Sequence, residues 1–271
     1  MVVPKIVGIL NITPDSFSDG GKFDSLQTAI NHVEKLIKDG ANVIDIGAES
    51  TRPTATPIKA EEEWSRLENI LPPLVKYIRN QKEKIEISLD SYHFETLQKA
   101  YEVGIDVVND VSGLCDDRII DFIAEKKIQT ILMHNRAIAV NENLVVNKEV
   151  GTALEVAKWV RDKINHLKRH GVEKSQLIFD VGIGFGKNAY QSIRILKNIE
   201  SYRAFGLPIY VGHSKKSFLK AINFEKDLSD GEKTLIISQF LIGRGVDYLR
   251  VHDVLEHKNL IKNLSEDLVI K

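Results

Sequence analysis

Short apolar runs rich in β-branched residues recur along the whole chain, and amphipathic segments separate them. Runs of this length and composition are typical of strands. Eight of them predict strands: KIVGILN, NVIDIG, KIEISLD, DVVNDV, QTILMH, QLIFD, PIYVG and DYLRVH. The pattern therefore predicts strands over the full length of the chain.

The segments between these runs carry apolar residues at helical spacing. One stripe predicts a helix that Gly40 can end, and it consists of Leu26, Ile30, Val33 and Ile37. A longer helix is predicted from the stripe Ala153, Ala157, Val160, Ile164 and Leu167. Further helices are expected at Phe94 to Val103, Arg118 to Lys126, Tyr190 to Ala204, Lys233 to Gly245 and Glu61 to Arg79. Pro72-Pro73 should kink or break the last of these, and Asn135 to Glu149 is expected to be a long loop.

Strands that alternate with helices predict a parallel sheet, and eight strands are the number that closes into a (β/α)8 TIM barrel. An open, doubly wound sheet is the alternative. Neither repeats nor a shift in composition indicates a second unit, so one domain over residues 1–271 is expected.

Composition narrows the class of protein. With 43% apolar and 28% charged residues the chain resembles an ordinary soluble protein, and its net charge of −1 gives no case for nucleic-acid or membrane binding. The single cysteine, Cys115, rules out an intramolecular disulfide and is expected to be a small buried residue. The first residues lack the pattern of a secretory signal, so a cytoplasmic location is expected.

Unusual polar residues stand at the end of every predicted strand. In a barrel, these ends and the loops after them form the active site. The residues concerned are Asn11, Asp45, Asp90, Asn109 with Asp110, His134, Asp180, the run GHSKKS, and Arg250 with His252. Any one of them could be polar only because strand ends meet water, but their joint chemistry indicates a site.

Basic residues among them predict an anion site. Arg250 and His252 lie two positions apart on a strand, so their side chains should emerge on the same face. Arg52 could add a bidentate contact to phosphate oxygens. The amide oxygen of Asn11 suits Mg²⁺, which prefers few protein ligands together with phosphate and water.

Acceptors on other strands predict recognition of a polar heterocycle. Asp90, Asn109 and Asp180 can read a ring edge that carries an amino group and a neighbouring N–H. Lys216 can donate to a ring nitrogen or carbonyl. The run DVGIGFGKN does not fit a phosphate loop, because Val181 replaces its first glycine and Asn188 its hydroxyl residue.

Eight sequence runs, in their order, resemble the dihydropteroate synthase family. They are GILNITPDSFSDGG, GANVIDIGAESTRP, SLDS, NDVSG, MH, DVGIGFGK, HSKKS and RVHDV. The resemblance implies a transferase that joins 6-hydroxymethyl-7,8-dihydropterin diphosphate to p-aminobenzoate and releases pyrophosphate. It also implies that the protein forms a homodimer. Its other partners would be these small-molecule substrates.

The resemblance assigns roles residue by residue. It places Asp90, Asn109, Met133, Asp180 and Lys216 around the pterin, and Asn11 with Mg²⁺, Arg52, Arg250 and His252 at the pyrophosphate. Phe17, Thr51, Pro53, Phe185 and Ser214 match positions that border p-aminobenzoate. Asp15 belongs to a first loop that, by the family pattern, closes over the substrates. The implied catalytic group is Asp15, Arg52, Lys216, Arg250 and His252.

Some positions depart from the family pattern. Thr54-Ala55 follows STRP where the family usually has glycine, Val181 replaces a proline, and Lys215 replaces an arginine. At Val181 we expect altered rigidity without loss of pterin recognition. The alternatives are a silent pterin-binding paralogue, a methyltetrahydrofolate-dependent methyltransferase, and an aldolase in which Lys216 forms a Schiff base.

Overall fold

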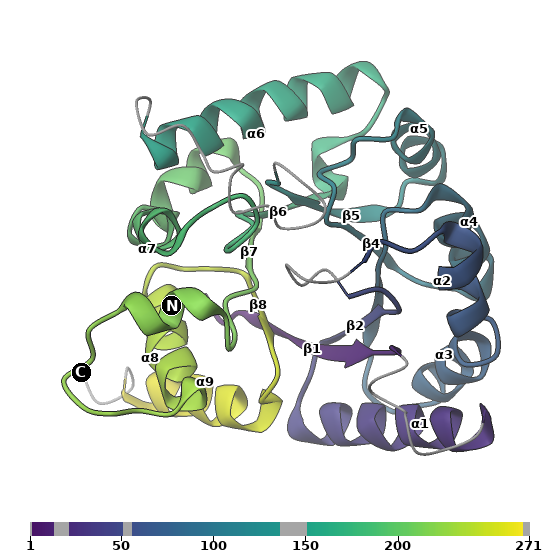
Figure 1. Ribbon diagram of the computed structural model, residues 1–271, viewed down its shortest axis with the longest axis horizontal. Helices are drawn as coiled ribbons and strands as arrows, with labels where there is room; N and C mark the ends of the chain where they lie inside the picture. The colour runs from purple at the N-terminus through teal and green to yellow at the C-terminus, as the bar shows by residue number, and fades with distance from the viewer. Residues whose placement is uncertain (1, 14–21, 51–55, 136–150, 268–271) are drawn as a thin grey trace.

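The computed structural model describes residues 2–13, 22–50, 56–135 and 151–267. Its parallel strands pair in sequence order and β8 pairs again with β1, so the sheet closes into a barrel (Figure 1). The strands are β1 (Lys5–Asn11), β2 (Val43–Gly47), β3 (Glu86–Asp90), β4 (Val107–Asp110), β5 (Gln129–Met133), β6 (Leu177–Asp180), β7 (Ile209–Val211) and β8 (Tyr248–Val251). The predicted TIM barrel is confirmed, and the open sheet is wrong. The domain bounds 1–271 stay a prediction.

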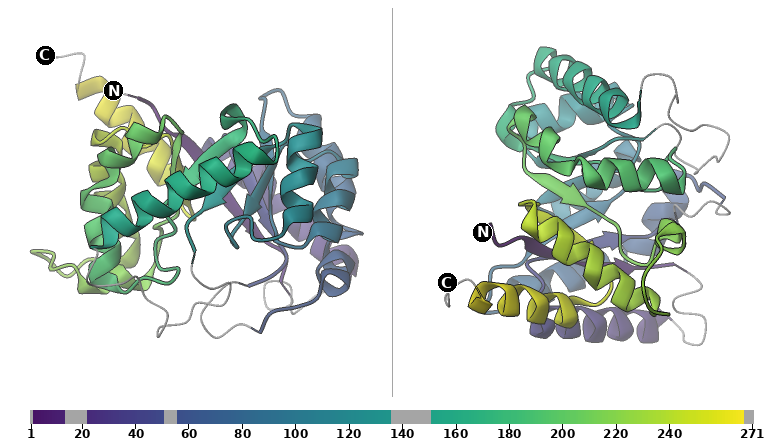
Figure 2. Two further views of the ribbon diagram at one scale, coloured as in Figure 1. Left: turned by 90° about the horizontal axis from the view of Figure 1, so that it is seen from above. Right: turned by 90° about the vertical axis from the view of Figure 1, so that its left-hand side faces the viewer.

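Helices surround the barrel on its outer side, as Figure 2 shows in two further views. They are α1 (Lys22–Asp39), α2 (Ala60–Leu67), α3 (Leu71–Arg79), α4 (Phe94–Val103), α5 (Asp117–Lys126), α6 (Thr152–Arg169), α7 (Ala189–Lys197), α8 (Asp230–Gly243) and α9 (Val254–Asp267). Short 3-10 helices occupy Lys174–Gln176, Ile199–Phe205 and Ser217–Ala221. None of the helices in the described ranges has the length and apolar character that crossing a bilayer requires.

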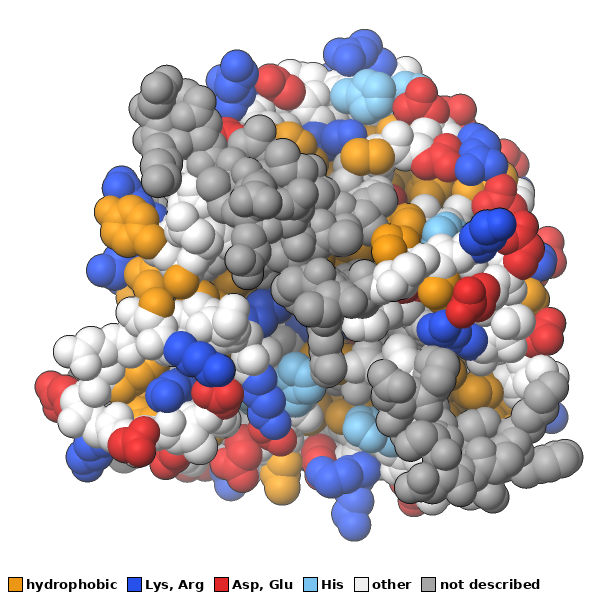
Figure 3. Space-filling view, viewed as in Figure 1, with side chains coloured by type: hydrophobic (Ala, Val, Ile, Leu, Met, Phe, Trp, Pro, Cys, Tyr) orange, Lys and Arg blue, Asp and Glu red, His pale blue; other side chains and the backbone are white. Residues whose placement is uncertain are grey.

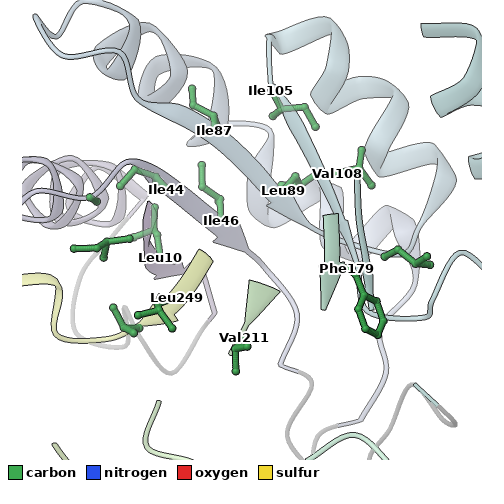
Figure 4. Packing of buried hydrophobic residues seen from close by; sticks show 14 of the residues in the cluster. Leu10, Ile44, Ile46, Ile87, Leu89, Ile105, Val108, Phe179, Val211 and Leu249 are labelled. Carbon is green, nitrogen blue, oxygen red and sulfur yellow. The ribbon is translucent and has the colours of Figure 1, made fainter. Parts of the chain in front are cut away.

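The two faces of each strand bury different kinds of side chain. Outward residues such as Leu10, Ile46 and Leu89 pack into the layer between strands and helices (Figure 4). Inside the barrel, a separate apolar cluster fills the part that lies farther from the carboxyl ends of the strands. It consists of Val7, Val43, Val107, Ile131, Ile178, Tyr210 and Tyr248. Side chains alternate along a strand, so the next inward positions toward the carboxyl ends lie directly above this cluster. Those positions carry the polar residues of the site.

Two predicted helix boundaries are confirmed. Gly40 follows the last residue of α1 with φ of +105°, a backbone conformation that glycine adopts without a Cβ clash. The predicted helix around Pro72-Pro73 is broken, because α2 ends at Leu67 and α3 begins at Leu71. The prolines then lie in the first turn of α3, where their missing N–H groups need no intrahelical partner.

Two other expectations were wrong, namely the length of one helix and the burial of Cys115. The helix expected from Tyr190 to Ala204 ends at Lys197, where Asn198 Nδ2 donates to a carbonyl of the last turn, and a 3-10 helix follows. Helix α9 was not predicted, because its buried face includes His257 among the apolar positions. Cys115 is exposed in the turn before α5 rather than buried. Of the expected long loop, Asn135 is buried and donates to Val111 O at 2.7 Å, and the remainder lies outside the described residues.

Candidate active site

A guanidinium group lies between two carboxylates at the floor of the barrel mouth. Arg250 lies inside the barrel on β8, two positions after Tyr248 of the apolar cluster. Its Nε donates to Asp45 Oδ2 at 2.6 Å, and its Nη2 donates to Asp90 Oδ2 at 2.9 Å. Asp45 is fully buried and also accepts from Asn109 Nδ2 at 3.2 Å. These contacts join β2, β3, β4 and β8.

Burial and ion pairing oppose each other in this cluster. Burial raises the pKa of Asp90 to about 7, although the charge of Arg250 acts in the other direction. For Arg250, burial disfavours the charge, but Asp45 and Asp90 outweigh it and raise the pKa of the guanidinium. The arginine therefore stays charged, whereas Asp90 titrates near neutral pH. Acids with such perturbed pKa values are typical of functional sites.

Asp180 supplies a third buried acid at the end of β6. Strand pairing aligns it with Met133 on β5, just as it aligns Asp90 with Asn109. Asp180 Oδ1 accepts from Gly182 N at 2.8 Å, and burial raises the pKa of this carboxyl group. All the acids and amides predicted to read a heterocycle thus lie on the inward face of the barrel mouth.

The loop after Asp180 is held by a buried lysine. Lys187 Nζ donates to the carbonyl oxygens of His134 at 3.0 Å, Gly182 at 2.7 Å and Phe185 at 2.9 Å. Gly182 has φ of +62°, and a Cβ there would lie 2.0 Å from His134 O. The glycine and lysine of this run therefore build a rigid turn, which agrees with the rejection of a phosphate loop.

Lys216 connects this loop to the loop after β7. Its Nζ donates to Ile183 O at 2.6 Å and lies 4.8 Å from the ring centroid of Phe185. Burial lowers the pKa of Lys216 to about 8, although the charge of Asp180 acts in the other direction. The side chain is thus a donor between the ring of Phe185 and the acid floor, which consists of Asp45, Asp90 and Asp180.

An apolar wall stands beside the acids. Met133, Phe185 and Val111 form a small buried cluster, and Tyr92 packs against it. Tyr92 Oη also donates to Glu49 Oε1 at 2.7 Å, which ties the β3 loop to the end of β2. Met133 and Phe185 were predicted site residues, and the structure brings them together.

Ser214 and His252 lie at the opposite corner of the mouth. Their Oγ and Nδ1 atoms are 2.9 Å apart, and the backbone N–H of His252 also donates to Ser214 Oγ at 3.3 Å. The Arg250 guanidinium contacts Asp45 and Asp90 rather than His252. The binding of one anion by Arg250 and His252 together therefore stays a prediction. Asn11 is exposed at the end of β1, on the same rim. In Figure 3, Lys, Arg and His side chains gather near the middle of this face.

Asp45 was predicted as a polar residue at a strand end, but the sequence assigned it no role. The acid stands inside the apolar run NVIDIG, two positions after inward-facing Val43, so its inward direction follows from strand periodicity. Other predicted residues lie outside the described part of the chain, and they are Asp15, Phe17, Thr51, Arg52 and Pro53.

Comparisons with known proteins agree with this site. The model of a family described as pterin binding enzyme matches residues 7–252. A dihydropteroate synthase of Clostridium beijerinckii is 36% identical over 270 residues, which cover 98% of this chain and 94% of that protein.

Solved structures are similar over nearly the whole chain. Dihydropteroate synthase from Anaplasma phagocytophilum with bound 6-hydroxymethylpterin-monophosphate has a TM-score of 0.86 and 36% identity, covering 97% of this chain and 99% of that one. The Xanthomonas albilineans enzyme with 4-aminobenzoic acid has a TM-score of 0.87 and 28% identity, covering 98% and 93%.

The barrel, its acid-lined mouth and the family match define a pterin-binding enzyme. The polar residues of the mouth lie within the matched range. More narrowly, the chain belongs to the dihydropteroate synthase family and is a transferase.

Proposed function

We propose that the barrel mouth condenses 6-hydroxymethyl-7,8-dihydropterin diphosphate with p-aminobenzoate, forming 7,8-dihydropteroate and pyrophosphate. The observation that carries this proposal is a set of three acids and two cations that are buried or half-buried: Asp45, Asp90, Asp180, Lys216 and Arg250. A site of this kind suits a flat heterocycle with several polar edge groups, because each donor of the ring can meet an acceptor.

The pterin lies, on this proposal, between the acid floor and the apolar wall. Asp180 accepts from the amino group and adjacent ring N–H, and Asn109 and Asp90 contact the other ring. Lys216 donates to a ring acceptor, and Met133 packs beside the ring. Support comes from the alignment of these strand ends and from the position of Lys216 Nζ between the acid floor and Phe185.

Departure of pyrophosphate is the step that needs electrostatic help. Heterolysis of the bond from the pterin methylene carbon to the diphosphate oxygen leaves negative charge on pyrophosphate. The amine nitrogen of p-aminobenzoate then bonds to that carbon and releases one proton to the solvent. We assign Arg52, Arg250 and His252 to this charge. No protein nucleophile is needed, because the leaving group already activates the carbon.

Mg²⁺ is compatible with the residues of this rim. The exposed side chain of Asn11 offers one amide oxygen, and Mg²⁺ commonly takes one or two protein ligands together with phosphate oxygens and water. When bound, the ion would neutralise charge on the departing pyrophosphate. Asn11 would hold it, and the basic residues would bind the remaining phosphate oxygens.

The second substrate is assigned to the outer part of the mouth. Phe185 and Ser214 lie on the β6 and β7 loops, and we place p-aminobenzoate against them together with Phe17, Thr51 and Pro53. Asp15 belongs to the first loop, whose closure would keep water from the activated carbon.

A two-substrate assay with and without Mg²⁺ tests the function. Purified protein mixed with the pterin diphosphate and p-aminobenzoate should release pyrophosphate, and omission of Mg²⁺ should slow the release. Normal pterin binding without turnover would support the silent paralogue instead. Failure to bind the diphosphate substrate would favour the methyltransferase, whose reaction has no anionic leaving group.

Homodimeric assembly and a cytoplasmic location are also proposals. The first rests on the family resemblance, and the second on the composition and the first residues of the chain. Light scattering after size-exclusion chromatography should give twice the mass of one chain.

A further inference from the structure

Two neighbouring helices on the outer side of the barrel present complementary metal ligands. Helix α6 carries His166, and His170 follows one turn later at the end of the helix. Helix α5 carries Asp117 and, one turn later, Asp121. Residues four apart on a helix share one face, so each helix presents a pair.

The distances between these pairs are close to those of a metal site. His166 Nε2 lies 3.7 Å from Asp117 Oδ1, and the two imidazole centroids are 4.7 Å apart. One ligand atom from each of Asp117, His166 and His170 lies within 4.8 Å of the other two. Ligand atoms about 2.1 Å from a tetrahedral zinc ion lie about 3.4 Å apart, so small side-chain rotations would close the site.

Asp121 sets the tautomer of one histidine. Its Oδ1 lies 2.8 Å from His170 Nδ1, and a carboxylate there accepts a proton from that nitrogen. In a neutral ring the lone pair is then on Nε2, which is the state that binds a metal. An outer carboxylate that orients a ligating histidine is a common feature of zinc sites.

We propose that Asp117, His166 and His170 bind one divalent transition-metal ion of the zinc type, with Asp121 orienting His170. Imidazole with carboxylate suits Zn²⁺, whereas Mg²⁺ prefers oxygen ligands. The ion would join α5 to α6. Figure 3 shows histidine and acidic side chains together at the rim where Figure 1 places the end of α6 beside α5.

Surface exposure and nearby charge limit the strength of this site. The side chains of Asp117, His166 and His170 are 70%, 34% and 26% exposed, so the ion would keep at least one water ligand. Lys163 and Arg169 add positive charge near His166, and Asp117 opposes it. We therefore expect affinity in the micromolar range. The site is separate from the barrel mouth and from the Mg²⁺ proposal at Asn11.

Zinc titration of the full chain tests the inference without any folate substrate. Competition with a chromogenic chelator should give one Zn²⁺ per chain, and Zn²⁺ should raise the melting temperature relative to EDTA. His166→Gln and His170→Gln should each weaken binding at least about 10-fold, and Asp121→Asn should weaken it by a similar factor. Co²⁺ should give the visible absorption of a tetrahedral site in the native chain but not in the His166→Gln and His170→Gln variants.

Two substitutions serve as matched controls. Asp162→Asn removes an exposed acid from α6, and His32→Gln removes an exposed histidine from α1. Both should leave zinc affinity within about 2-fold, because neither residue belongs to the cluster. Absence of stoichiometric binding, or binding that survives both histidine substitutions in folded protein, would overturn the proposal. Either result would leave the proposed enzyme function unaffected.

Discussion

Two buried polar networks meet the barrel mouth from different sides, and they differ in charge. In the ionic network, Arg250 lies between Asp45 and Asp90. In the neutral network, Ser238 Oγ lies 2.7 Å from His213 Nε2 and 2.8 Å from His257 Nε2. Burial lowers the pKa of His213 to about 3 and also lowers the pKa of His257, so both rings are neutral at physiological pH.

The neutral network has a defined order of donors. His257 Nδ1 lies 2.7 Å from the carbonyl oxygen of Asp253 and must donate to it, which leaves Nε2 as an acceptor. The Ser238 hydroxyl therefore donates to His257 and accepts from His213. The hydroxyl also lies 2.9 Å from Thr234 O, so the two acceptors share one proton. This chain ties the β7 loop, through α8 and α9, to the β8 loop.

The neutral network has a structural role, whereas the ionic network can respond to a bound ligand. The neutral network holds the loops that carry Ser214 and His252, and every assigned donor in it has an acceptor. The ionic network contains an acid that titrates near pH 7 and a charged arginine that a bound ligand could share. Ligand binding can therefore redistribute charge in the ionic network, and we expect substitutions there to respond to pH and to ligand.

Arg250→Ala should have the largest effect. It leaves Asp45 and Asp90 without their cation, and breaking a buried pair in this way costs about 3–5 kcal/mol of unfolding free energy. The loss should be smaller at pH 5 than at pH 8, because Asp90, whose pKa is raised to about 7, needs no cation once it is protonated. Pyrophosphate release should slow much more than p-aminobenzoate affinity falls. Urea unfolding at both pH values and pre-steady-state assays measure these effects.

An exposed arginine provides the control for that experiment. Arg118 bonds Asp116 and Glu95 on the surface, and Arg118→Ala should lower the unfolding free energy far less than Arg250→Ala does, because solvent screens exposed ion pairs. Equal costs for the two variants, or equal effects of Arg250→Ala on pyrophosphate release and p-aminobenzoate binding, would contradict the assigned role.

Asp180→Ala should abolish pterin binding, and Asp180→Asn should weaken it by about 100-fold or more. The amide keeps an oxygen for Gly182 N but loses the charge that the pterin edge needs. Calorimetry with a pterin ligand measures the change. Asp253→Asn removes an exposed acid at the same mouth and should change the affinity less than about 3-fold. Retention of normal affinity in Asp180→Asn would show that the acid does not read the ring.

Ser238→Ala tests the neutral network. The substitution removes the shared partner of His213 and His257 and should lower the unfolding free energy by about 1–3 kcal/mol. The loss should be the same at pH 7 and pH 9, because both rings are neutral at these values. Ser238→Thr keeps the hydroxyl and should recover part of the loss. A cost that changes as steeply with pH as that of Arg250→Ala would remove the distinction between the two networks.

The pattern of apolar residues alone predicted the barrel, because each strand can be recognised from the few residues that form it. The same local pattern placed Asn109 and Asp180 correctly at strand ends. Arg250 shows the limit of this reasoning, since its partners are 205 and 160 residues away in sequence. Those contacts depend on strand pairing and barrel closure, which a single sequence does not encode locally. The same holds for Ser214 with His252, 38 residues apart.

Asp90→Asn should have the smallest effect on the unfolding free energy, and it tests the ionic network through the pH dependence of that free energy. The folded pKa of Asp90 is about 7, above its usual value of 3.8, so its contribution to stability is fully present below pH 3.8 and is lost as pH rises through 7. The neutral amide avoids this loss. The unfolding free energy of the variant should therefore gain on the native protein by up to about 1.4 kcal/mol per pH unit between pH 5 and 7, and the difference should level off above pH 8. Urea titrations at each pH measure it. A difference that does not change with pH would mean that Arg250 keeps Asp90 ionised throughout, and the ionic network would then be as insensitive to pH as the histidine chain.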